Sequence, residues 1–94
     1  MERGFYVLAY DIGNDKRRTK IARLMESLGE RVQGSVFEAY LNAEELQKIV
    51  KKSKKVMKDK EDSLRIYFLC QPCRVKIGIY GNGRVTLPPG VVVV

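Results

Sequence analysis

The sequence predicts an α+β fold in which two helices pack on one face of an antiparallel sheet. Three observations support this prediction: an apolar run at residues 5–10, two stretches with the spacing of amphipathic helices, and a stretch at 64–70 in which apolar residues alternate with others. The 94 residues suit one hydrophobic core, and no repeat or linker suggests a second. We therefore assign residues 1–94 to a single domain.

The charge balance indicates an anionic partner. Lysine and arginine number 18 against 11 acidic residues, which gives a formal net charge of +7 at pH 7. A small basic domain gains affinity for a phosphate backbone by releasing condensed counterions, so RNA or DNA is the first candidate. Because the chain contains no histidine, catalysis would depend on carboxylates, hydroxyls, arginine or lysine, with a metal ion supplying acidity.

No apolar run approaches the roughly 20 residues that a membrane-spanning helix needs. A predicted strand follows the first four residues directly, which leaves no room for a signal peptide. We therefore expect a cytoplasmic protein without a membrane partner.

The first predicted element is a strand that ends in a carboxylate. Residues Phe5 to Asp11 form an apolar run of the length of a buried strand, and residues 12–14 then provide a turn. A charge at the end of a buried strand usually has a partner or a function. Asp11 is consistent with a metal ion, a phosphate backbone or a plain ion pair, and the strand alone leaves these three open.

A basic amphipathic helix follows, with Asn14 or Asp15 as its N-cap. The apolar stripe has the i, i+3, i+4, i+7 spacing of one buried face: Ile21, Leu24, Met25 and Leu28. The opposite face is basic: Lys16, Arg17, Arg18, Lys20 and Arg23. The first turn of the helix follows Asp11 so closely that its arginines should lie near the end of the strand. We expect Gly29 to end the helix with a positive φ.

Residues 31–41 are extended in character, and Gly34 divides them into two strands. Asn42 and Glu45 then have the spacing of a capping box, which predicts a second helix. The apolar stripe of this helix is Leu46, Ile49, Val50, Val56 and Met57. Its polar face carries Lys48, Lys51, Lys52, Lys54, Lys55, Lys58 and Lys60.

From residue 62 the period changes to two, which predicts a strand to residue 70, a turn, and another strand over 74–80. Gly81-Asn82-Gly83 supplies the residues of a tight hairpin. We expect residues 84–94 to form a C-terminal edge segment that pairs with a partner subunit, because four unpaired terminal valines would promote aggregation. The complete order is that of a ferredoxin-like βαββαβ sandwich with an additional C-terminal β-strand or hairpin.

The two cysteines, Cys70 and Cys73, form a C-x-x-C motif between two predicted strands. A redox pair of the thioredoxin type begins a helix, and structural zinc needs four ligands. The simplest interpretation is therefore two small residues at a strand end and turn. An intersubunit zinc site and a disulfide are the alternatives.

Four groups of residues, in this order, resemble a known family. They are Tyr10-Asp11-Ile12, Lys16-Arg17-Arg18 with Lys20-Ile21, the stretch from Arg31 to Glu38, and the stretch from Glu61 to Tyr67, followed by the two cysteines. Together they are similar to the second universal CRISPR-associated protein family. Its members are small ferredoxin-like adaptation subunits, described as metal-dependent endonucleases and as partners of the CRISPR integrase. The resemblance covers residues 5 to about 80.

The resemblance implies a homodimer in which Asp11 from both subunits holds Mg²⁺ at the two-fold axis. A two-fold interface brings a residue to its own copy, which would supply the oxygen ligands that one aspartate lacks. The family positions implicated in activity correspond here to Asp11, Tyr10, Arg18, Arg31, Ser35 and Phe37. For RNA or DNA binding we single out Lys16, Arg17, Arg18, Lys51, Lys52 and Lys55.

Each of these residues also has a structural interpretation. Arg18 can pair with Asp15, Ser35 can serve a turn, and Phe37 can belong to the core instead of stacking on a base or lining a cleft. For the whole protein we consider a Mg²⁺-dependent endonuclease, a non-catalytic architectural subunit of the integrase complex, and a toxin-like messenger-cleaving ribonuclease of the same fold.

Overall fold

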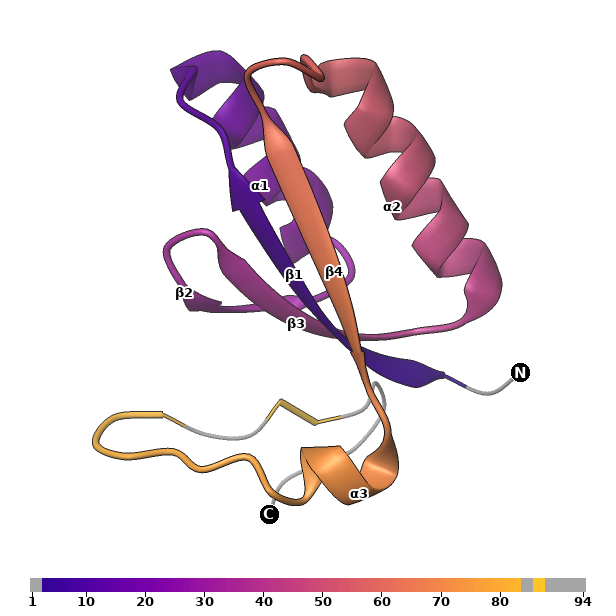
Figure 1. The fold of residues 1–94 in the computed structure, drawn as a ribbon, viewed down its shortest axis with the longest axis vertical. Helices are drawn as coiled ribbons and strands as arrows, with labels where there is room; N and C mark the ends of the chain where they lie inside the picture. The colour runs from indigo at the N-terminus through magenta and orange to yellow at the C-terminus, as the bar shows by residue number, and fades with distance from the viewer. Residues whose placement is uncertain (1–2, 84–85, 88–94) are drawn as a thin grey trace.

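The molecule is built around a four-stranded antiparallel sheet with the order β2-β3-β1-β4, seen in a computed structural model that describes residues 3–83, 86 and 87. The strands are β1 (Gly4–Asp11), β2 (Glu30–Gln33), β3 (Val36–Leu41) and β4 (Ser63–Leu69). The helices are α1 (Asp15–Glu26), α2 (Ala43–Val56) and the short α3 (Gln71–Arg74). The long helices α1 and α2 cover one face of the sheet (Figure 1). The predicted ferredoxin-like βαββαβ order is confirmed.

Strand β1 is central, and its side chains alternate between the two faces of the sheet. Leu8 and Tyr10 point to the helices and belong to the core, where Phe37 lies opposite Leu8 on β3. The intervening residues, among them Asp11, point to the opposite face, away from both long helices. Sequence parity along β1 therefore sets which side chains face the long helices. The opposite face is covered at the Phe5 end, where Phe5 and its β3 neighbour Tyr40 are buried and the Arg74 guanidinium of α3 lies over the Tyr40 ring.

Both predicted helix starts are confirmed. The Asn14 side chain accepts a 3.0 Å hydrogen bond from the backbone N–H of Arg17. At α2, Asn42 and Glu45 form a complete capping box, with reciprocal bonds of 2.9 and 2.8 Å. The bond from the Asn42 N–H, supported by Arg3, lowers the pKa of Glu45 below its usual value. Each cap is worth about 1 kcal/mol of helix stability.

An enclosed ion pair connects the start of α1 to the loop before β4. Arg17 donates from Nε to Asp62 Oδ2 at 2.7 Å, and its guanidinium also bonds Glu61 at 2.9 Å. The Asp62 side chain has no exposed surface, and it also accepts the backbone N–H of Lys58 at 2.9 Å. Hydrogen bonding from Arg17, with that from Lys58, lowers the pKa of Asp62.

The strand predicted over residues 74–80 is wrong. Residues 71–74 instead form α3, and the backbone N–H groups of residues 75–77 continue to bond carbonyls three or four positions back. Pro72 favours this turn, since its fixed φ suits the first positions of a helix. Val75 and Tyr80 remain exposed, so the alternating pattern has no sheet edge to join. Of the predicted C-terminal segment, only Thr86 and Leu87 lie within the described residues.

Gly29 does not have the positive φ that the sequence suggested, a conformation that among the described glycines only Gly81 adopts. It is required for close approach instead. A Cβ at this position would lie 2.8 Å from the carbonyl oxygen of Glu38 and 3.0 Å from the Cβ of Ala39. Gly29 therefore lets the chain leave α1 directly alongside β3.

Candidate functional site

The predicted site residues divide between the two faces of the sheet. Asp11 is the last residue of β1, lies opposite Ser63 of β4 and is exposed. Tyr10 precedes it and is only 5% exposed, because it points into the helix-covered core. Adjacent strand residues point to opposite faces, so these two cannot line the same cavity.

A hollow of about 560 Å³ on the helix side collects four of the six predicted catalytic residues. These four are Tyr10, Arg18, Arg31 and Ser35, and the lining is completed by Thr19, Ala22, Arg23, Glu26 and Gly34. The end of β1 is fastened to the β2–β3 turn by a 3.1 Å hydrogen bond from the Tyr10 N–H to the Ser35 carbonyl. Three arginines and one glutamate make this hollow strongly basic.

Phe37 does not line the hollow but supports it from below. It is completely buried, and its ring stacks with that of Tyr10 at a centroid distance of 6.2 Å. The Arg31 guanidinium lies 5.1 Å from the Phe37 ring centroid and also pairs with Glu26 at 2.8 Å. The suggested use of Phe37 as a stacking surface for a base, or as a wall of the cleft, is therefore wrong. Its contacts place the Arg31 guanidinium and the Tyr10 ring.

Arg18 braces the loop that follows Asp11. Its Nη1 donates to the carbonyls of Ile12 and Gly13 at 3.1 and 3.3 Å, and its Nη2 pairs with Asp15. The pairing with Asp15 was the structural alternative considered for this residue. Its side chain is still 45% exposed, so it fixes the loop while leaving positive charge at the surface.

Arg17 differs from its neighbour, because its donors are used within the molecule. Its side chain is only 16% exposed and is shared between Asp62 and Glu61. We therefore leave Arg17 out of the candidate phosphate-binding set. Lys16 and the α2 lysines at 51, 52 and 55 are exposed and remain in it.

The carboxylate of Asp11 has no hydrogen-bond or ion-pair partner among residues 3–83, 86 and 87. Nor does this part of the chain contain a group of three or more acidic, cysteine or histidine residues placed to hold a metal ion. Hard cations such as Mg²⁺ require several oxygen ligands, some of which are commonly water. Within the described residues, one chain thus offers a single free carboxylate at this place.

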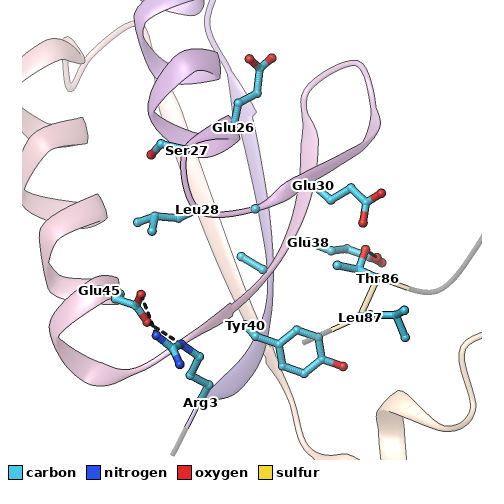
Figure 2. A pocket seen from close by; sticks show the side chains of 12 residues that line it. Arg3, Glu26, Ser27, Leu28, Glu30, Glu38, Tyr40, Glu45, Thr86 and Leu87 are labelled. Atoms are coloured by element: carbon cyan, nitrogen blue, oxygen red, sulfur yellow. Dashed lines mark hydrogen bonds and ion pairs between the residues drawn. The ribbon is translucent and has the colours of Figure 1, made fainter. Parts of the chain in front are cut away.

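A second hollow, of about 490 Å³, has the opposite character (Figure 2). It lies where the chain leaves α1 for β2, and Glu26, Glu30, Glu38 and Glu45 surround it together with Arg3. Arg3 bonds Glu45 at 3.1 Å, and the Thr86 hydroxyl donates to Glu38 at 2.5 Å. This acidic lining is unsuited to a phosphate, so the basic hollow is the better candidate for nucleic acid.

Residues 4–77, from the start of β1 to just beyond α3, match the family model described as CRISPR associated protein Cas2. The chain belongs to the Cas2 family. It is 44% identical over 89 residues to the protein named CRISPR-associated endoribonuclease Cas2 3 of a Synechocystis strain, covering 95% of this chain and 97% of that one. None of the helices that the structure describes is long and apolar enough to cross a membrane.

Solved structures share the fold of this Cas2 family member. A crystal structure of a hypothetical protein from Thermus thermophilus superposes with a TM-score of 0.79 at 36% identity, covering 90% of this chain and 99% of that one. A chain from a partial Cas6-RT-Cas1–Cas2 complex gives a TM-score of 0.77 at 30% identity, with 96% and 99% covered.

The sequence analysis missed three polar residues of the basic hollow: Thr19, Arg23 and Glu26. Their spacing from Arg18 could have identified them, because positions 18, 19, 22, 23 and 26 fall on one face of an α-helix. That face had been interpreted only as a basic surface. The residues that resemble the family motifs thus line a basic hollow on one side of the sheet and, on the other side, include a carboxylate without a partner among the described residues.

Proposed function

We propose that the chain is a Mg²⁺-dependent endonuclease that works as a homodimer and binds the CRISPR integrase in spacer acquisition. The single observation that supports this most is the exposed carboxylate of Asp11 at the end of a buried strand, which has no partner among the residues that the structure describes. Relatives that are named endoribonuclease or endonuclease support the reaction class. The similar chain from a complex containing Cas1 supports the partner.

The sheet face opposite the long helices suits a second copy of the chain at its Asp11 end. By strand alternation it carries Val7, Ala9, Val36 and Tyr67 beside Asp11. Tyr67 is 48% exposed. In an isologous interface each residue approaches its own copy or a symmetry-related one. Pairing through this face would bury these apolar groups and bring two Asp11 carboxylates towards one axis.

Two such carboxylates fit Mg²⁺, which is commonly held by one or two carboxylates and several waters. When bound, the ion would supply Lewis acidity and lower the pKa of a water that attacks the phosphodiester. Asp11 would hold the ion. Arg18 keeps the loop after Asp11 in place through the Ile12 and Gly13 carbonyls.

Exposed cations on the helix side would bind the phosphate backbone. Arg18, Arg31 and Ser35 line the basic hollow. Lys16 lies in the first turn of α1, the helix that carries Arg18. Lys51, Lys52 and Lys55 extend the positive charge along α2. Binding through these groups should weaken steeply with salt, because each neutralised phosphate releases a counterion.

The test compares cleavage of labelled RNA and DNA, with Mg²⁺ and with EDTA, by the wild type and by Asp11→Ala. We expect Asp11→Ala to lower the cleavage rate at least about 100-fold, the cost typical of removing a group that stabilises transition-state charge. Asp59→Ala is the matched control, because Asp59 is also an exposed aspartate. Cleavage by Asp11→Ala at the wild-type rate would contradict the role of Asp11.

An architectural role is the second candidate, and the similarity to a chain solved together with Cas1 favours it. It predicts that Asp11→Ala still supports spacer acquisition, whereas charge reversal at Lys51, Lys52 and Lys55 abolishes it. An acquisition assay with the integrase separates the two roles. Loss of acquisition by Asp11→Ala in an intact complex would exclude a purely architectural function.

A further inference from the structure

The position of the C-x-x-C motif differs from the predicted one in a way that changes its chemistry. Cys70 follows β4 and is the N-cap residue of α3, and Cys73 lies within that helix. The expected position between two strands disfavoured a redox pair. No strand follows the motif up to residue 83, however, so that objection to a redox pair does not apply.

The local backbone brings the two cysteines together on one helical turn. The N–H groups of Cys73 and Arg74 both bond the Cys70 carbonyl, at 3.1 and 2.9 Å. Pro72 restricts the intervening backbone. Both cysteines are free and exposed, so a solution oxidant can reach them.

The two thiols are not equivalent. Hydrogen bonding from Cys73 lowers the pKa of the Cys70 thiol, and the same interaction raises the pKa of the Cys73 thiol. Cys70 thus has the character of an attacking thiolate, and Cys73 that of a resolving thiol. We do not attribute this difference in pKa to a helix dipole, because α3 has only four residues.

We propose that Cys70 and Cys73 form a reversible dithiol–disulfide site that reacts with low-molecular-weight disulfides such as glutathione disulfide. The Cys70 thiolate attacks one sulfur of the disulfide, forms a mixed disulfide and releases one thiolate, which takes up a proton. Cys73 then loses its proton to solvent and attacks Cys70 Sγ, which expels the second thiolate. Two electrons pass from the cysteine pair to the external disulfide, and the products are one internal disulfide and two thiols.

Zinc is the competing occupant of a cysteine pair, and the surroundings do not favour it. Structural zinc takes four protein ligands. Within one chain, no third cysteine, histidine or carboxylate joins the pair among the residues that the structure describes, so zinc would require the cysteine pair of a second subunit. The site also lies apart from Asp11, at the opposite end of β4, because Asp11 pairs with Ser63 whereas Cys70 follows Leu69. The proposal is therefore independent of nuclease activity.

The first experiment incubates the reduced full chain with excess glutathione disulfide and follows its intact mass. We expect the wild type to lose two hydrogens and to remain a single chain without bound glutathione. Cys73→Ser should instead accumulate a stable mixed disulfide at Cys70, because the resolving thiol is absent. Cys70→Ser should react several-fold more slowly. Melting curves of both serine variants check that they remain folded.

The second experiment alkylates the reduced wild type at pH 7 and maps the products by peptide. We expect Cys70 to be modified several-fold faster than Cys73, and dithiothreitol to restore both thiols after oxidation. Stable glutathione adducts on the wild type, or equal reactivity of the two cysteines, would overturn the proposal. So would retained zinc that shields both thiols until a chelator is added.

Discussion

Two aspartates at the same end of the sheet show how similar sequence contexts can have different uses. Asp11 ends β1, and Asp62 immediately precedes β4, where Ser63 pairs with Asp11. Asp62 is enclosed and accepts bonds from Arg17 and the Lys58 N–H, whereas Asp11 is exposed and has no partner among the described residues. The satisfied carboxylate holds the fold together, and the free one remains available for a ligand.

The largest effect on stability should come from Asp62→Ala. The substitution leaves Arg17 without its principal partner and the Lys58 N–H without an acceptor, and breaking an enclosed pair is strongly destabilising. We expect Tm to fall by more than about 8 °C, given the shift per kcal/mol that is usual for a domain of this size. Thermal denaturation followed by circular dichroism measures it. A fall no larger than that of Asp59→Ala would contradict the structural role of Asp62.

The contribution of the Arg17–Asp62 pair to stability should also depend on pH. Because the folded state lowers the pKa of Asp62, the pair stabilises the protein fully above the ordinary aspartate pKa of about 3.9. That contribution is lost as the pH falls below this value and through the lower folded pKa. We expect Tm of the wild type to fall between about pH 4 and pH 2 more steeply than that of Asp62→Asn. If Tm fell equally with pH in the wild type and in Asp62→Asn, protonation of Asp62 would not be linked to unfolding.

Ser53 tests the converse case, a polar group without a partner. Its side chain is completely buried on α2, and its hydroxyl has no hydrogen-bond partner in the described part of the chain. Since an unsatisfied buried polar group costs about 1–3 kcal/mol, Ser53→Ala should raise Tm by at least about 4 °C. Ser27→Ala is the control, because that hydroxyl is exposed and donates to Leu24 at 2.6 Å. A decrease in Tm on Ser53→Ala would show that the hydroxyl is satisfied in solution.

The smallest effect on stability should come from Asp11→Ala. Surface substitutions that remove no interaction stay within about 0.5 kcal/mol, so Tm should change by less than about 4 °C. Differential scanning fluorimetry of the metal-free protein is sufficient. Together with the cleavage assay, this result would separate loss of function from loss of fold. A large fall in Tm would assign Asp11 a structural role similar to that of Asp62.

Periodicity predicted β1, the two long helices, β3 and β4 because each of them has a side that packs on the core and that its apolar spacing reports. Strand β2 has no buried residue, and only the extended character of residues 31–41 and the break at Gly34 indicated it. Periodicity failed at residues 74–80, because alternating apolar residues indicate a strand only where a sheet edge is free to pair with them. Residues 71–74 instead form the short helix α3, which Pro72 favours. Phe37 entered the predicted site through the family resemblance, with a place in the core as its alternative, and the structure supports the core alternative because the side chain is completely buried. The separation of Tyr10 from Asp11 could have been predicted, since adjacent strand residues point to opposite faces.

The pairing of β1 with both neighbours makes the chain tolerant of length changes on one side of Asp11 and intolerant on the other. Leu8 is fixed opposite Phe37 on β3 and Ile66 on β4, and three positions separate it from Asp11. One residue inserted between them would turn the carboxylate into the helix layer, because strand faces alternate with a period of two. Residues added to the turn after Asp11 would leave its orientation intact, so homologous chains should vary in length after this aspartate and not before it.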